Sequence, residues 1–228
     1  MTNKEFRKIE EYMIGCMSDS AHDKEHVYRV LYIALDIAEH EENVNMDILL
    51  AACLLHDIGR KEQIEDPRVC HAEVGSKKAY EYLISIGWSD ENATLVRECI
   101  YTHRFRSNNP PKSIEAKILF DADKVDVCGA MGMARSLIYR GSVTEPLYTL
   151  YDDNTVCDGE NTDEPSFFRE YHYKLKKLYS RFFTERGAAL AKERKKAAED
   201  FYNSLLTESR KAHENGRKRL ENCLKEDK

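Results

Sequence analysis

Apolar residues recur along most of the chain at the spacing of one helix face. Between about residues 22 and 40 they occupy the i, i+3, i+4 and i+7 positions of an amphipathic helix that carries His26 near its start. The strict alternation of a half-buried strand hardly appears. This pattern predicts an all-α protein with strands absent or minor.

One stretch, Ile48 to Leu55, is apolar on every side, which is typical of a buried helix. Asn45 or Asp47 can cap this helix, and we expect it to run through His56-Asp57 and to stop at Gly59. Two ionisable groups would then reach the end of the helix inside the protein. An unpaired buried carboxylate is costly, so a metal ion is a natural partner there.

The same reasoning predicts further helices and breaks. We expect a helix from His71 to Gly87, one capped by Ser89 or Asp90 that runs to His103, a break at 108–111, a helix from Ser113 through Asp126, and one from Gly129 to about Tyr139.

The C-terminal part begins with an irregular acidic stretch, Tyr148–Glu164, which has few apolar residues to bury and is expected to be a surface insertion. From 166 to about 226 the composition is helical, and the charge run Lys192–Lys196 is expected to be a solvated face. We therefore expect one domain over residues 1–228, with its core at about 22–140 and a C-terminal helical extension.

Composition excludes several classes of protein. The 228 residues are 42% hydrophobic and 33% charged, enough for one well-buried core. The net charge of -6 argues against binding duplex nucleic acid, so an anionic substrate must meet a local basic cluster. The seven scattered cysteines favour a reducing compartment, and no apolar run reaches membrane-spanning length. We expect a cytoplasmic protein without a membrane partner.

Several imidazoles and carboxylates are not explained by the apolar pattern: His26, His56, Asp57, His71, His103, Asp123 and Asp126. A mixed nitrogen and oxygen set suits a divalent transition metal, namely manganese, iron, cobalt, nickel or zinc. Adjacent helical residues point about 100° apart, so His56 and Asp57 share an ion only if it lies beyond the helix end, where Gly59 leaves room.

Helix geometry separates the later aspartates. Asp123 projects to the side shared with Asp126, whereas Asp121 points nearly opposite, so we prefer Asp123 as ligand with Asp126 in support. For His71 and His103 a capping or solvent-facing role stays open.

The order His26, His56-Asp57 and Asp123, with HVYRV around the first histidine and LLHDIG around the pair, resembles the H...HD...D signature of the HD superfamily of metal-dependent phosphohydrolases. The resemblance covers about residues 22–140. His22-Asp23 and the run DADKVDVCGAMGMAR are similar to a bacterial subgroup of small stand-alone HD hydrolases.

This resemblance implies an HD-domain helical bundle in which His26, His56, Asp57 and Asp123 hold a divalent ion. A subset of the superfamily has two further histidines and binds two metals bridged by the HD aspartate. His71 and His103 stand at such positions, which implies a dinuclear centre bridged by Asp57.

It also implies hydrolysis of a small phosphorylated molecule such as a nucleotide. Metal ions lower the pKa of a bound water toward neutrality. Asp57, Glu62 or Asp126 would orient or deprotonate that water. The candidates for phosphate binding are the basic residues beside the ligands: Arg60, Lys61, Arg104, Arg106 and Lys124.

Two alternatives stay open at this point. Some HD proteins with the additional histidines are di-iron oxygenases, and a non-catalytic nucleotide sensor would keep the fold without turnover. The C-terminal helices are candidates for a homodimer interface.

Overall fold

The computed structural model describes residues 1–17, 24–105 and 109–224. Helices dominate these ranges, and the only β-type pairing within them is an isolated bridge between Leu150 and Val156. The all-α prediction is confirmed. No helix in the described ranges is both long and apolar enough to cross a bilayer.

The chain separates into two compact units, each described by itself: Met1–Asp126 with Arg181–Ala191, and Val127–Ser180 with Lys192–Lys228. The expected single domain stays a prediction.

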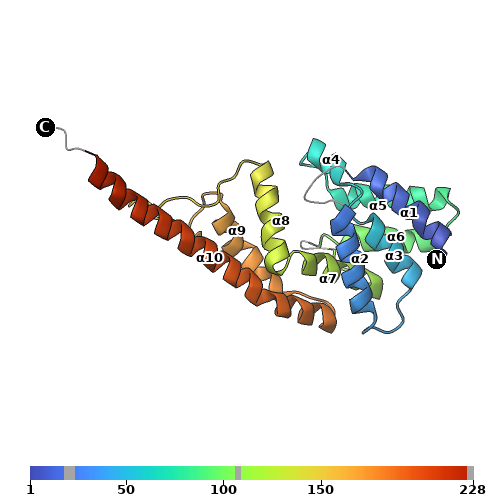
Figure 1. Cartoon of the computed structure of the whole chain (residues 1–228). Coiled ribbons are helices and arrows are strands. Elements are labelled where there is room, and N and C mark those ends of the chain that lie inside the picture. Colours follow the sequence, from blue (N-terminus) through green and yellow to red (C-terminus); the bar gives the residue numbers. More distant parts are fainter. Residues whose placement is uncertain (18–23, 106–108, 225–228) are drawn as a thin grey trace. The chain divides into compact units, whose positions relative to one another are not determined.

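The first unit is built from the consecutive helices α1 to α7 (Figure 1). They are α1 (Asn3–Cys16), α2 (Lys24–Ala38), α3 (Met46–Leu55), α4 (Arg60–Glu65), α5 (His71–Ser85), α6 (Asp90–Thr102) and α7 (Ile114–Asp126). Helix α3 contacts α1, α2, α5, α6 and α7. Because it is apolar on every side, α3 forms the centre of the core and fixes where its two ends lie.

The ends of α3 decide the position of the ionisable pair. Asn45 caps the start, since its side chain accepts hydrogen bonds from the backbone of Asp47 and Ile48. The helix ends at Leu55 rather than running through Asp57, and His56 is its C-cap. Gly59 does not end α3 but is the N-cap of the short helix α4, which the sequence pattern did not predict.

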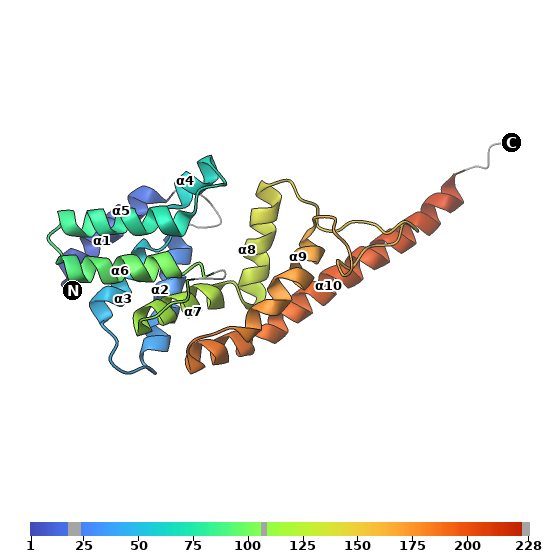
Figure 2. The ribbon, with the colours of Figure 1, turned by 180° about the vertical axis from the view of Figure 1, so that it is seen from behind.

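Helices α5 and α6 lie side by side in both views (Figures 1 and 2). As expected, α5 begins at His71, and the chain turns at Gly87, whose φ of 96° suits glycine. Ser89 is the cap of α6, and His103 is its C-cap. Two histidines, His71 and His103, are therefore placed by the ends of neighbouring helices.

The turn after α3 touches the start of α5 very closely. A Cβ atom on Gly59 would lie 2.3 Å from the carbonyl oxygen of His71 and 2.7 Å from the nitrogen of Gly75. We expected Gly59 to leave room for an ion, and that is wrong, because the space is filled by the backbone of α5. The missing side chain lets Asp57 and His71 approach each other.

The second unit contains α8 (Gly129–Ser142), α9 (Phe167–Tyr173), the 3-10 helix η1 (Leu175–Ser180) and most of α10 (Glu185–Cys223). Figure 2 shows α9 beside α10, and their core includes Phe167, Phe168 and Tyr202. The acidic stretch is irregular, as expected, but it has more to bury than we expected. Val156 and Cys157 are buried, because the stretch packs its middle against this core.

Candidate metal centre

Four histidines from four different helices converge inside the first unit. His26 comes from α2, His56 ends α3, His71 begins α5 and His103 ends α6, and all four are buried. The Nε2 atoms of His26 and His56 are 3.3 Å apart, and those of His71 and His103 are also 3.3 Å apart. The histidines therefore form two pairs.

Asp57 lies between the two pairs and turns one oxygen to each. Its Oδ2 is 3.6 Å from Nε2 of His26 and 3.7 Å from Nε2 of His56. Its Oδ1 is 3.5 Å from Nε2 of His71 and 3.6 Å from Nε2 of His103. Asp57 is buried, and within the described residues its Oδ2 has no hydrogen-bond partner.

Asp123 completes the first pair. Its Oδ1 is 3.4 Å from Nε2 of His26. We call His26, His56, Asp123 and Oδ2 of Asp57 the first half-site, and His71, His103 and Oδ1 of Asp57 the second half-site. Asp121 points elsewhere and accepts hydrogen bonds from Phe183 and Thr184, just before α10. The structure thus brings the six predicted ligands together and keeps Asp121 apart.

The Nδ1 atom of every histidine faces an oxygen acceptor. His56 donates to the carbonyl of Cys53 at 2.8 Å, and His103 donates to that of Ile100 at 2.6 Å. His26 faces Oδ2 of Asp126, and His71 faces Oε1 of Gln63, both at 2.8 Å. Because Nδ1 carries the proton in each ring, the lone pair of each Nε2 points into the centre.

Burial also keeps two of these rings neutral near pH 7. It lowers the pKa of His56 to about 4 and that of His71 to about 2. Burial would raise the pKa of Asp57, but the positive charge of Arg60 and the neighbouring imidazoles outweigh it and hold the pKa well below its usual range. Neutral imidazole and ionised carboxylate are the forms that bind metal ions.

The spacing suits metal ligands. Two donor atoms that are each about 2.1 Å from one tetrahedral ion lie about 3.4 Å from each other. The separations of 3.3 to 3.7 Å within the two half-sites match this value. Each half-site fits one divalent ion.

Two residues that hold the ligands were missed in the sequence. Arg29 binds both oxygens of Asp126, at 2.8 and 3.2 Å, and so holds this carboxylate against His26. Gln63 donates to the carbonyl of Val69, which turns its Oε1 toward His71. Arg29 lies one turn after His26, a signal that was available, whereas Gln63 belongs to the helix that was not predicted.

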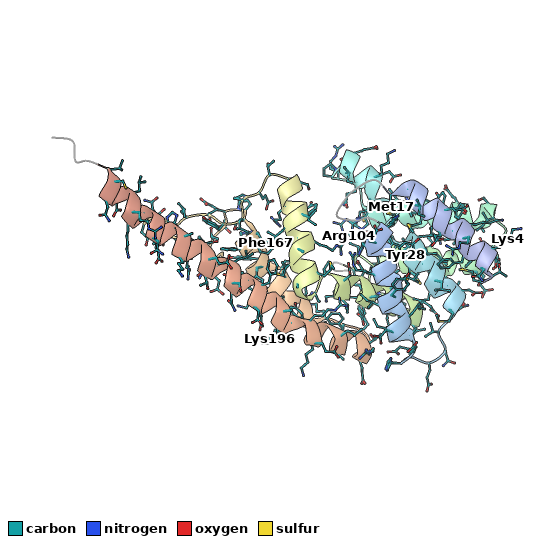
Figure 3. All side chains as sticks on the ribbon, viewed as in Figure 1. Lys4, Met17, Tyr28, Arg104, Phe167 and Lys196 are labelled. Atoms are coloured by element: carbon teal, nitrogen blue, oxygen red, sulfur yellow. The ribbon has the colours of Figure 1, made fainter. Side chains whose placement is uncertain are left out.

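Some of the remaining predicted site residues contact the candidate ligands, and others do not. Arg60 donates to Oδ1 of Asp57 at 3.0 Å, and a guanidinium nitrogen of Arg104, which follows α6 (Figure 3), is 3.4 Å from Nδ1 of His71. Glu62 pairs with Lys78 at 2.7 Å. Lys61 is exposed on α4.

Lys124 and Arg106 do not join this group of basic residues. Lys124 lies over the rings of Phe120 and Phe182 and donates to the carbonyl of Arg181. Arg106 lies outside the described residues, as does the His22-Asp23 pair. Arg60 and Arg104 are thus the predicted basic residues whose contacts reach the centre.

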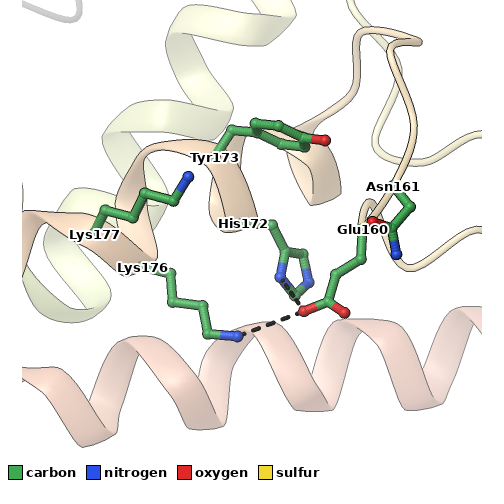
Figure 4. Close-up of a pocket in the computed structure, with 6 residues that line it drawn as sticks. All are labelled: Glu160, Asn161, His172, Tyr173, Lys176 and Lys177. Carbon is green, nitrogen blue, oxygen red and sulfur yellow. Dashed lines mark ion pairs between the residues drawn. The ribbon is translucent and has the colours of Figure 1, made fainter.

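A separate pocket of about 440 Å³ lies in the second unit, among residues of α9, η1 and the acidic stretch. Figure 4 shows Glu160 in it, paired with His172 at 2.9 Å and with Lys176 at 3.6 Å. Nε2 of His172 also forms a hydrogen bond with the hydroxyl of Tyr202. The polar groups of this pocket are largely paired with one another, and none of them belongs to either half-site.

Comparisons with known proteins identify a family and relatives that are similar to this chain. Residues 24–128 match the model of the HD domain family. The chain is 30% identical over 197 residues to the uncharacterized protein YpgQ of Bacillus subtilis, an alignment that covers 84% of this chain and 87% of YpgQ.

Solved structures are similar as well. The crystal structure of YpgQ in complex with ADP superposes with a TM-score of 0.69 at 26% identity, covering 89% of this chain and 97% of YpgQ. An HD-superfamily hydrolase from Bacillus thuringiensis superposes with a TM-score of 0.67 at 26% identity, covering 90% and 96%.

Proposed function

The chain belongs to the HD-domain family, and from this premise we propose that it is a metal-dependent phosphohydrolase acting on a nucleotide or a similar small phosphorylated molecule. One observation carries the proposal: the two oxygens of Asp57 face two separate histidine pairs. This is the arrangement of a carboxylate that bridges two metal ions. We propose that His26, His56 and Asp123 hold one ion, and that His71 and His103 hold the other.

Two bound divalent ions would polarise a phosphoryl oxygen and lower the pKa of a water molecule toward neutrality. The contribution of the protein is to fix the ligands. Asp126, held by Arg29, keeps the ring of His26 in place, so we assign it a positioning role rather than that of the base. Asp57 is buried at the centre and is our candidate for orienting the water, with Glu62 as the second candidate.

The substrate class follows from charge. Arg60 and Arg104 place two guanidinium groups beside the second half-site, in a protein whose overall charge is negative. Nη2 of Arg60 makes no hydrogen bond to the described residues and is our candidate for binding a phosphate oxygen. The structure of the relative YpgQ with ADP supports a nucleoside phosphate as the ligand class.

The test is a screen of phosphate release by metal-reconstituted protein across nucleoside mono-, di- and triphosphates, dinucleotides and sugar phosphates. We expect metal-dependent release from at least one nucleotide, and none from the His56→Ala variant. Nucleotide binding without release, in protein shown to hold metal, would contradict the proposal and favour the sensor alternative.

The same six ligands suit two iron ions, so an oxygen-dependent oxidation is the second candidate function. The two arginines support the hydrolase, because guanidinium groups bind phosphate oxygens. Both reactions need the metals, but hydrolysis consumes no oxygen. Phosphate release that continues under argon supports the hydrolase. Oxygen consumption on addition of substrate would support the oxygenase.

A further inference from the structure

The two half-sites carry unequal charge. The first contains the carboxylate of Asp123 in addition to its share of Asp57. The second contains the imidazoles of His71 and His103 and, among the described residues, no carboxylate of its own. A divalent cation is therefore bound by more negative charge, and by one more donor atom, in the first half-site than in the second.

Among the described residues, Arg60 brings its positive charge directly onto a ligand atom of the second half-site, whereas Arg29, behind the first half-site, is paired with Asp126. Nε of Arg60 is 3.0 Å from Oδ1 of Asp57, the oxygen that faces His71 and His103. An ion in the second half-site would share that oxygen with the guanidinium. Their like charges repel across a buried site, where water screens poorly.

Gln63 fixes Arg60 in this place. Its Oε1 accepts from Nη1 of Arg60 at 3.1 Å and from Nδ1 of His71 at 2.8 Å, while its Nε2 donates to the carbonyl of Val69. Asp57, Arg60, Gln63 and His71 thus form a ring of contacts around the second half-site. Gln63 is neutral, so it orients the guanidinium without cancelling its charge.

We propose that Arg60, held by Gln63, makes the second half-site the weaker of the two, so that the chain binds one divalent ion tightly and one exchangeably. The inference rests on the two-ion form of the proposed function and adds which ion exchanges and which residues set its affinity. An anionic phosphate would offset the positive charge of Arg60, so the second ion is expected to bind more tightly together with substrate.

The test is calorimetric titration of the metal-stripped full chain with Mn²⁺ alone. We expect two binding events whose dissociation constants differ at least tenfold. His71→Ala should remove the weaker event and His26→Ala should weaken the tighter one, which assigns each event to a half-site.

Two conservative variants then test the role of charge. Arg60→Gln removes the positive charge, and Gln63→Glu neutralises it while keeping an oxygen acceptor for both Arg60 and His71. Each should tighten the weaker event at least tenfold and leave the tighter event within about threefold. The matched control is Arg68→Gln, because Arg68 is exposed and pairs with Asp66, and it should leave both events unchanged.

The outcomes that overturn the inference are specific. If both variants leave the weaker event unchanged or weaken it, Arg60 and Gln63 only orient Asp57 and His71, and charge does not set the affinity. A single event in the wild type that survives His71→Ala, or two events of equal affinity, also overturns it. None of these measurements uses turnover, so a failure of phosphate release alone would overturn the proposed function and leave this inference standing.

Discussion

At the scale of the residue, one side chain joins the whole centre. Asp57 is buried and lies within 3.5 to 3.7 Å of all four histidines, with its two oxygens divided between two pairs. Each imidazole is oriented from behind by an oxygen acceptor. The local geometry thus prepares the ligand atoms before any ion arrives, which lowers the cost of ordering them.

Replacing Asp57 by alanine should remove most metal from both half-sites, because each loses its shared oxygen. His56→Ala should remove most metal from the first half-site, which is the one we propose to bind its ion tightly. Metal content after dialysis is the measurement. His40→Ala is the control, since His40 is exposed just after α2 and its side chain bonds to the carbonyl of Asp36. Full retention of metal by the Asp57 variant would contradict the site assignment.

Two aspartates of α7 should have different roles, Asp123 in metal binding and Asp121 in stability of the fold. Asp123→Asn replaces a charged candidate ligand by a neutral amide and should lower the affinity of the first half-site for its ion at least tenfold. Asp121→Asn should leave metal affinity unchanged but cost roughly 1 to 2 kcal/mol of unfolding free energy, because buried Asp121 accepts bonds from Phe183 and Thr184. Metal titration and urea unfolding measure the two effects, and the reverse pattern would refute the helical-face argument.

At the scale of the element, helix ends position the chemistry. The C-caps of α3 and α6 and the first residue of α5 each contribute one histidine. The turn after α3 meets α5 at Gly59 and Gly75. Packing between these elements therefore controls the distance between the half-sites.

Gly59→Ala should force α5 away from the turn, because its Cβ would lie 2.3 Å from the carbonyl oxygen of His71. We expect a loss of about 1 to 3 kcal/mol of unfolding free energy and a lower metal affinity of the second half-site. Gly15→Ala is the matched control, since nothing lies within 4 Å of that Cβ and alanine favours helix by up to about 1 kcal/mol. Equal stability of the two variants would argue against the close contact.

The contact between α1 and α2 should depend on pH. Tyr28 donates to Glu10 at 2.7 Å, which lowers the pKa of Glu10 below its ordinary 4.5 and raises that of Tyr28 to about 12. Because the pKa of Glu10 is depressed on folding, its contribution is full above pH 4.5 and is lost as pH falls through the lowered value. The raised pKa of Tyr28 predicts a further loss only as pH rises from about 10 toward 12.

Tyr28→Phe should therefore be destabilised relative to wild type by about 1 kcal/mol at pH 7 and by less at pH 3.5. Urea unfolding at both pH values measures the difference. Tyr32→Phe is the control, because Tyr32 lies on the same helix and is exposed. A difference that stays constant across this range would show that the hydroxyl contributes without its ionised partner.

At the scale of the whole molecule, the candidate metal ligands all belong to the first of the two compact units. They come from helices spread between residues 26 and 123, so an ion that binds them also holds these helices together. Metal binding should therefore stabilise the fold of this unit.

Mn²⁺ at about 100 times the dissociation constant of one site should add about 2.7 kcal/mol to the unfolding free energy of the first unit. Trp88 is the only tryptophan of the chain and packs against the core of that unit, so its fluorescence reports this transition. Asp57→Ala protein should show no such shift. A shift of equal size in that variant would mean that Mn²⁺ binds elsewhere.

Local pattern alone predicted much of the fold. Helical periodicity depends on residues within a few turns of each other, and it located α2, α3 and α5 to α7 to within a few residues. The caps Asn45 of α3 and Ser89 of α6 were among those expected. It also placed Asp123 and Asp121 on opposite sides of α7, and the structure agrees. The sequence missed α4 because its six residues are too few to show a period.

Residue type and order along the chain determined the all-α class, the burial of α3 and the candidate ligands, because these follow from local composition and spacing. Only the tertiary structure decided that the oxygens of Asp57 divide between two histidine pairs, that Gln63 and Arg29 hold the ligands, and that Gly59 admits α5 rather than an ion. These features depend on contacts between helices far apart in sequence. Packing around α3 sets those contacts, and no local period encodes them.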